Sequence, residues 1–213
     1  MRAPDDLARV KQAAEEASWL LSRGYPTEAV ASFVSTQRAL TDDEQRLLAC
    51  SARCAANVKH HIARELDAED VRKRRLEIDA DSLLSCLVSA DADALLLASG
   101  AGLICDPTWR RGEAAFGSEH ASALARACAQ IASLGANECC FWVAPNWSDA
   151  LSAALAPLTK KKPRADVKVG EVTTELAGAA FVVSCDPMVL DRARSWVNLL
   201  LLMAPDVPRL TLE

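Results

Sequence analysis

The sequence predicts an α/β protein in which a mostly parallel sheet flanked by helices follows a small all-helical domain. Two observations carry this prediction. Apolar residues recur at helical spacing through residues 5–66, and beyond Arg75 short apolar runs of strand length alternate with helical patterns. With 213 residues, of which 51% are hydrophobic, the chain is long enough for one domain of ordinary size and a smaller one.

The first domain, residues 1–70, is expected to consist of helices. We predict them at Asp5–Ser22, at Thr27–Ser35 and from Thr41 to about Leu66. Gly24 suits the end of the first helix, because glycine accepts the left-handed conformation found there. Thr41 with Glu44 forms a capping-box pattern at the start of the third. Residues 67–75 then make a charged connection to the second domain.

The second domain, residues 76–213, is expected to alternate strands with helices. Strands are predicted at Leu76–Asp79, Leu103–Asp106, Cys139–Val143, Val167–Val169, Phe181–Ser184 and Val197–Met203. Helices are predicted at Ser82–Ser89, Ala94–Ala98, Ser118–Leu134, Trp147–Leu158 and Pro187–Trp196. This alternation is typical of a sheet with helices on its faces.

The composition restricts the classes of function. A net charge of −5 argues against a whole surface devoted to polyanions, although local basic runs can still bind them. No apolar run reaches the roughly 18 residues of a membrane helix, and the N-terminus lacks the apolar region of a signal peptide. We therefore expect an intracellular protein with no membrane partner, in the cytoplasm or an organelle. The eight cysteines lie mostly within apolar patterns, which indicates reduced thiols.

Acids stand at the ends of predicted strands. Asp79, Asp106 and Asp186 occupy the edge where parallel sheets bind ligands and metals. Each acid also has an ordinary structural role open to it, since Asp106 can form the turn that follows it and the others can cap helices. Asp81, two residues beyond Asp79, can also cap a helix. At a helix start we expect its side chain to point away from the other acids.

Basic and aromatic residues supply candidates for nucleic-acid contacts. They are Arg74, Arg75, Trp109, Arg110, Arg111, Lys160, Lys161 and Lys162. Trp109 beside two arginines is the tryptophan best placed to stack on a base. Trp142, in an apolar run, is expected in the core, and Trp147 is a weaker stacking candidate. The basic runs can equally be solvated linkers or loops.

The words Trp-Leu-Leu-Ser-Arg-Gly-Tyr-Pro at residues 19–26 and Arg-Ala-Leu-Thr at residues 38–41 resemble an uncharacterised family. It is domain-of-unknown-function family 434, known mainly from archaea. Members carry a second domain that looks like the PIN or NYN type of nuclease, so the resemblance implies a PIN-like, Rossmannoid sheet. It also implies that Asp79, Asp106 and Asp186 gather to hold Mg²⁺ or Mn²⁺ for phosphodiester hydrolysis. Arg110 or Arg111 would then contact phosphate.

The resemblance continues weakly along the chain, with departures at polar positions. Matching words are Ile78-Asp79, Cys105-Asp106, Arg111, Pro145 and Ser184-Cys185-Asp186. Departures are Ser35 and Ala80 where the family has Gly, Ser82 for Asn, Pro107-Thr108 for Asp-Gly, and Val143 for Asp. A retained scaffold with lost polar positions is what an inactive descendant of a nuclease would show.

Two hypotheses about function follow. The first is a catalytically degenerate PIN-like protein associated with RNA, which serves as a binding or assembly subunit of an RNA-processing or ribonucleoprotein complex. The alternative is an active Mg²⁺- or Mn²⁺-dependent ribonuclease that uses Asp79, Asp106 and Asp186. The expected partners are RNA, protein subunits of an RNA-containing complex, or both. The sequence has no nucleophile-elbow, P-loop or dinucleotide-binding motif that would indicate another chemistry.

Overall fold

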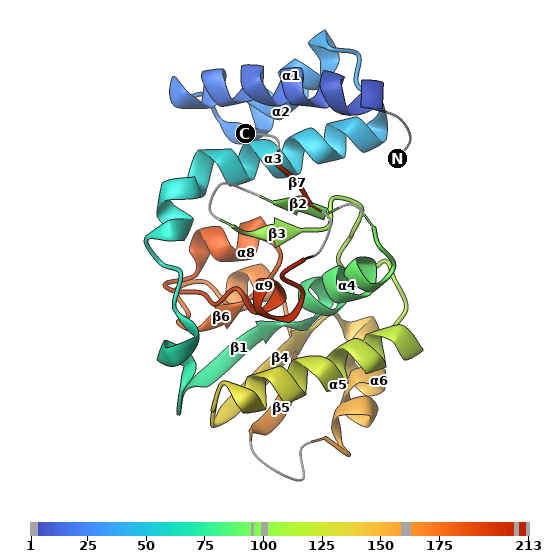
Figure 1. Ribbon diagram of the computed structural model, residues 1–213, viewed down its shortest axis with the longest axis vertical. Coiled ribbons are helices and arrows are strands. Elements are labelled where there is room, and N and C mark those ends of the chain that lie inside the picture. Colours follow the sequence, from blue (N-terminus) through green and yellow to red (C-terminus); the bar gives the residue numbers. More distant parts are fainter. Residues whose placement is uncertain (1–3, 95, 99–101, 159–162, 207–208, 212–213) are drawn as a thin grey trace.

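The computed structural model describes residues 4–94, 96–98, 102–158, 163–206 and 209–211. Lys160, Lys161 and Lys162 lie outside the described residues. N-terminal helices are stacked on one end of an α/β region, as Figure 1 shows. The predicted fold class, helices followed by a mostly parallel sheet with helices around it, is confirmed.

The N-terminal region consists of α1 (Pro4–Ser22), α2 (Thr27–Gln37) and α3 (Asp42–Ile62). The capping box predicted for α3 is present: the Thr41 hydroxyl accepts a hydrogen bond from the Glu44 amide, and the Glu44 carboxylate accepts one from the Thr41 amide at 2.7 Å. α1 and α2 both pack on α3, and buried side chains including Val10, Val34 and Leu48 fill the space between them. α3 ends at Ile62, earlier than predicted.

The main sheet contains β1 (Arg75–Asp79), β4 (Glu138–Val143), β5 (Arg164–Val169) and β6 (Val182–Val183) in the order β5-β4-β1-β6. All three pairings are parallel. Its side chains alternate between two buried clusters, as a pleated strand requires. Phe141 lies in the cluster that includes α4 (Ala80–Asp91), α5 (Ser118–Ser133) and α6 (Ser148–Leu155), whereas Trp142 lies in the cluster that includes the N-terminal helices.

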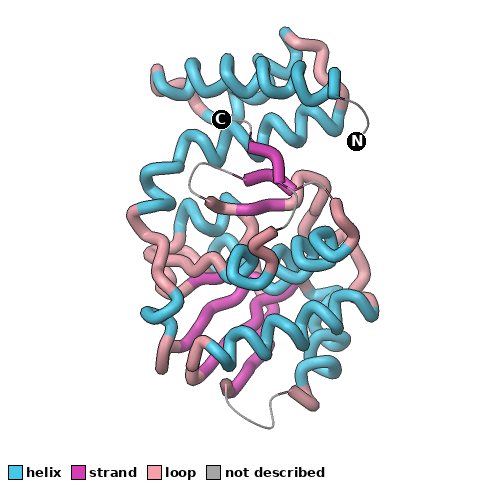
Figure 2. The backbone as a smooth tube through the Cα atoms, in the orientation of Figure 1, coloured by secondary structure: helices cyan, strands magenta, loops and turns pink. Residues whose placement is uncertain are grey.

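A second, smaller sheet lies between the N-terminal helices and the main sheet, as Figure 2 shows. It consists of β3 (Ile104–Cys105), β2 (Leu96–Ala98) and β7 (Arg209–Thr211). β2 pairs antiparallel with β3 and parallel with β7. The helix predicted at Ala94–Ala98 is therefore wrong, because residues 96–98 pair on both sides and form a strand.

The strand predicted at Val197–Met203 is also wrong, since residues Leu199–Met203 form helix α9. A short run of leucines has no periodicity that separates a strand from a helix. The deciding residue is Asn198, whose side-chain oxygen accepts a hydrogen bond from the Leu201 amide at 3.1 Å and so caps the helix. The other elements are α7 (Val172–Glu175), α8 (Pro187–Arg192) and 3-10 turns at Ala68–Val71 and Pro145–Trp147.

The end of α3 is joined to α8 by polar contacts. His61 is fully buried, and its Nε2 lies 2.9 Å from Oδ1 of Asp191. The Trp196 indole donates to the His61 carbonyl at 2.9 Å, and Arg64 donates to the Leu190 carbonyl at 2.9 Å. These bonds position the N-terminal helices over the carboxyl edge of the main sheet. Within the described residues, no helix is both long and apolar enough to cross a membrane.

Candidate functional site

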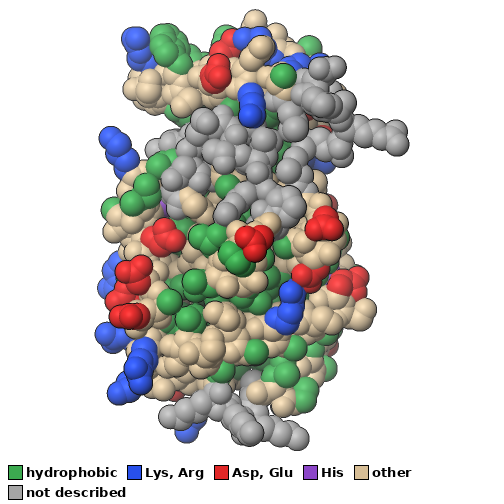
Figure 3. Space-filling view, in the orientation of Figure 1, with side chains coloured by type: hydrophobic (Ala, Val, Ile, Leu, Met, Phe, Trp, Pro, Cys, Tyr) green, Lys and Arg blue, Asp and Glu red, His purple; other side chains and the backbone are tan. Residues whose placement is uncertain are grey.

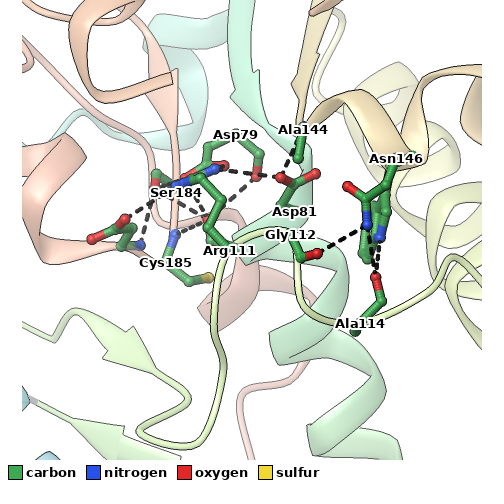
Figure 4. A network of polar contacts seen from close by, with 12 residues as sticks. Asp79, Asp81, Arg111, Gly112, Ala114, Ala144, Asn146, Ser184 and Cys185 are labelled. Carbon is green, nitrogen blue, oxygen red and sulfur yellow. Dashed lines mark hydrogen bonds and ion pairs between the residues drawn. The ribbon is translucent and has the colours of Figure 1, made fainter. Parts of the chain in front are cut away.

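Polar side chains gather where β1 and β6 end. Asp79 is the last residue of β1, and Asp186 caps α8 shortly after β6. Asp81 lies in the first turn of α4, which begins directly after Asp79. Arg111 enters this group from the segment between β3 and α5, as Figure 4 shows. We call Asp79, Asp81, Asp186 and Arg111 the carboxylate centre.

The Arg111 guanidinium binds the acids of the centre directly. Its Nη1 lies 2.7 Å from Oδ1 of Asp79 and its Nη2 lies 2.9 Å from Oδ2, so the two side chains form a bidentate pair. The same Nη2 donates to Oδ2 of Asp186 at 3.0 Å. Oδ2 of Asp81 is 3.6 Å from Nη1. One cation therefore lies among the three carboxylates.

Two serines complete the shell around Asp79. The hydroxyls of Ser82 and Ser184 donate to Oδ2 of Asp79 at 2.8 and 2.7 Å. Ser82 in turn accepts from the Cys185 amide, and Ser184 accepts from the Asp186 amide. Asp79 has no exposed surface, and both its carboxylate oxygens have protein donors. Its hydrogen-bonding capacity is thus used within the chain.

The segment that carries Arg111 is anchored by the 3-10 turn Pro145–Trp147, which directly precedes α6. The Asn146 amide group donates to the carbonyls of Gly112 and Ala114 at 3.1 and 3.2 Å, and the Trp147 indole donates to the Ala114 carbonyl at 2.7 Å. Trp147 is buried against Phe116 and therefore does not stack on a base. These contacts hold the backbone beside Arg111, so the guanidinium is positioned by the fold.

The carboxylate centre has three acids and one cation, and the pKa values of two of the acids are raised. Burial, and next the charge of Asp79, raise the pKa of Asp81 to about 6. The same two causes raise the pKa of Asp186 above its ordinary value. Burial alone would lower the pKa of Arg111, but its bonds to Asp79 and the charge of Asp186 raise it above the ordinary value. Arg111 is therefore permanently charged.

Asp106 lies apart from the carboxylate centre in its bonding. Its Oδ1 accepts from the amide and the hydroxyl of Thr108, both at 2.7 Å, and its Oδ2 accepts from the Ser89 hydroxyl at 2.5 Å. The structural role predicted for Asp106, forming the turn that follows it, is observed. Capping of the next helix by Asp186 is observed too, because its Oδ1 accepts from the Met188 amide.

Asp106 and Asp186 both line a cavity of about 470 Å³, to whose wall α3 also contributes. Trp109, Arg110, Arg111 and Arg46 contribute to its walls. The Arg111 guanidinium stacks on the Trp109 ring, with Cζ 5.0 Å from the ring centroid. Arg110 donates to the backbone carbonyl of Trp109 at 2.6 Å. We call this space the Trp109 cavity.

Mg²⁺ and Mn²⁺ do not fit the acids as they are arranged. Such an ion needs several oxygens converging on one point with free lone pairs. Here Arg111 takes that position between Asp79 and Asp186, and Asp106 is bound to Ser89 and Thr108 instead. In the part of the chain that the structure describes, no three His, Cys, Asp or Glu side chains are grouped to hold a metal.

The other basic candidates lie away from this site. Arg75 is at the opposite end of β1 and is paired with Glu77 at 2.8 Å. Arg74 stacks over the Phe181 ring, with Cζ 5.5 Å from the centroid. Trp142 is in the core, as predicted, and its indole donates to Glu77 at 2.7 Å. The described candidates therefore do not form one basic surface.

The orientation predicted for the Asp81 side chain is wrong. It was expected to point away from the other acids, but its Oδ2 accepts from the Ala144 amide at 3.0 Å and faces Arg111. α4 follows β1 without a loop, and helical side chains tilt toward the helix N-terminus. That tilt returns Asp81 to the strand edge. The signal available in the sequence was the absence of any turn residue between Asp79 and Asp81.

These features define a protein with an α/β sheet, an N-terminal group of helices, and a buried carboxylate centre closed by an internal arginine. Residues 9–64, about a quarter of the chain, match the family described as "Protein of unknown function (DUF434)". The match covers the helical region and stops before the sheet. No curated protein and no solved structure matches the chain.

Proposed function

We propose that this protein is a catalytically inactive, PIN-like, RNA-associated protein that acts as a binding or assembly subunit of an RNA-processing or ribonucleoprotein complex. The observation that carries the proposal is the bidentate pair between Arg111 and Asp79. It supports loss of catalysis because the guanidinium lies between Asp79 and Asp186, two of the acids that the family resemblance assigns to a divalent ion.

A guanidinium cannot replace that ion chemically. It remains protonated at any ordinary pH and has no open coordination position, so it neither activates water nor acts as a Lewis acid. It neutralises part of the charge of the buried acids instead, which preserves the fold. The centre therefore has a structural role that does not require turnover.

The Trp109 cavity offers a place for single-stranded RNA. Trp109 lies there with Arg110 and Arg46, and an aromatic ring among guanidinium groups suits bases and backbone phosphates together. Such contacts tolerate many sequences, because every base has a face that can stack. Binding that does not depend on base sequence is sufficient for a subunit that assembles with other proteins on an RNA.

Binding and cleavage can be measured on one preparation. We expect a mixed pool of single-stranded RNA to bind, with an affinity that falls as salt rises, and to remain intact in the presence of Mn²⁺ or Mg²⁺. Trp109→Ala should weaken binding about 5- to 150-fold, the loss of one stacked base. Arg126→Ala, which removes an exposed arginine on α5, is the matched control and should not change binding.

The alternative remains a divalent-metal ribonuclease. Mn²⁺-dependent cleavage that disappears in Asp79→Asn would establish it and would refute the inactive proposal. Calorimetric titration with Mn²⁺ is a second measurement, and the proposal expects no saturable heat. If RNA fails to bind at micromolar concentration at low salt, the association with RNA is wrong.

A further inference from the structure

A second cavity adjoins the Trp109 cavity. Its volume is about 400 Å³, and each of the two cavities has the size of an ordinary small-ligand pocket. Arg46, Asp106 and Pro107 line both cavities, so these three residues form a partition between them. The remaining walls of the second cavity are Asp43, Leu47, Asp93, Ala94 and Thr108. We call this second space the Asp93 cavity.

We propose that the two cavities together bind a dinucleotide unit of single-stranded RNA. One base stacks on Trp109, the other base carries an amino group and enters the Asp93 cavity, and the phosphate that joins the two nucleotides lies at the partition. The inference rests on the proposed function, because it assigns a length, a phosphate contact and a base preference to the same RNA site.

Two guanidinium groups lie at the partition. Nη1 of Arg110 donates to the Pro107 carbonyl at 3.2 Å, so this side chain is held against one of the partition residues. Arg46 reaches the partition from α3, and its side chain is 47% exposed. It is paired at 3.2 Å with Asp43, one helical turn earlier, and surface pairs of this kind contribute little. Arg46 can therefore exchange Asp43 for a phosphate, which a guanidinium binds well.

The acids around the two cavities separate the base site from the phosphate site. Asp106 is 8% exposed, and its oxygens accept from Ser89 and Thr108, so little of its carboxylate is available to a ligand. Asp43 and Asp93 are exposed at the wall of the Asp93 cavity. Their charges disfavour a phosphate there, but a carboxylate accepts a hydrogen bond from a base amino group, such as N4 of cytosine. Uracil has no amino group, so the Asp93 cavity should prefer cytosine to uracil.

The surface outside the cavities favours a short binding site. Basic and acidic side chains are interspersed over the face shown in Figure 3, and the whole chain has a net charge of −5. Binding energy from each further phosphate requires a cation that neutralises it. RNA longer than two nucleotides should therefore gain little affinity.

NMR titration at low salt with cytidine, the dinucleotide CpC and a cytidine hexanucleotide tests the length of the site. We expect CpC to bind at least about tenfold more tightly than cytidine, and the hexanucleotide to gain less than about threefold over CpC. Arg46→Ala should remove most of the gain from cytidine to CpC, whereas Trp109→Ala should weaken cytidine itself. Arg126→Ala, at an exposed arginine on α5, is the matched control and should keep the gain. Circular dichroism checks that each variant is folded.

Mixed dinucleotides test the base preference. Because only the Asp93 cavity selects for an amino group, one of CpU and UpC should bind about as tightly as CpC, and the other at least about threefold more weakly. Three results would overturn the inference while leaving RNA binding in place: a hexanucleotide that binds although CpC gains nothing over cytidine, a full gain in Arg46→Ala, or equal affinities of CpC, CpU and UpC. A hexanucleotide that does not bind would refute the association with RNA as well.

Discussion

Arg111 is the residue on which the interpretation of the site depends. Its side chain is 21% exposed, and it binds Asp79, which has no exposed surface, and Asp186. A buried pair of this kind is weak evidence of net stabilisation over an apolar pair, yet removing one partner leaves an uncompensated charge in the interior. The consequence for stability is therefore larger than for any surface arginine.

Arg111→Met should destabilise the protein by about 3–5 kcal/mol at pH 8. The loss should shrink toward pH 4, because the pKa values of Asp81 and Asp186 are raised and these two acids, once protonated, need no counter-charge. Urea unfolding at the two pH values measures it. Arg126→Met removes an exposed pair with Asp91 and should cost less than about 1 kcal/mol at either pH. Equal losses for the two variants would mean that the carboxylate centre is solvated.

The junction of β1 and α4 determines which acids meet. Because the helix starts at Ala80, immediately after the strand, Asp79 and Asp81 reach the same edge from different elements. Among the residues that the structure describes, none is a hydrogen-bond partner of the buried Oδ1 of Asp81 or of the buried Ser85 hydroxyl, one turn further along α4. The junction therefore carries a buried acid whose charge the fold does not fully compensate.

Asp81→Asn should stabilise the protein above pH 6. The pKa of Asp81 is about 6 when folded and 3.8 in the reference state, so the folded state holds the proton more tightly. That contribution is complete below pH 3.8 and is lost as pH rises through 6. Asparagine keeps an acceptor for the Ala144 amide without the charge, so we expect a gain of about 1–3 kcal/mol at pH 7.5 and almost none at pH 3.5. Thermal unfolding of both proteins across this range measures it, and a gain independent of pH would contradict the assignment.

At the level of helices and strands, some features of the structure could be predicted from the sequence and others could not. The capping box of α3, the β1 strand and the parallel sheet follow from local patterns, and these predictions are confirmed. Asp79 and Asp186 were assigned to one edge from strand ends alone, and both do bind Arg111. β2 could not be predicted because it depends on pairing with β7, more than a hundred residues later. The pairing of Arg111 with Asp79 could not be predicted either, because it depends on how Asn146 anchors the loop that carries Arg111.

At the scale of the whole molecule, one buried cluster connects the helical region to the sheet. Leu48 of α3, Trp142 of β4 and Trp196 belong to it. The polar contacts around His61 and Asp191 lie at its edge, and Asp191 also accepts from the Asn57 side chain at 2.8 Å. The helical region and the sheet thus share one interior, and residues of both line the Trp109 cavity.

Asp191→Ala should loosen this connection. It leaves His61 buried without its partner, so we expect a loss of about 2–4 kcal/mol. Because the bond joins α3 to α8, hydrogen exchange should quicken first in α1, α2 and α3, while β1 and β4 stay protected. Asp191→Asn retains an acceptor at the same position and should cost about half as much. Uniform exchange across both regions in Asp191→Ala would instead show that the buried cluster alone couples them, and that the His61 contact adds nothing to the docking of the helices.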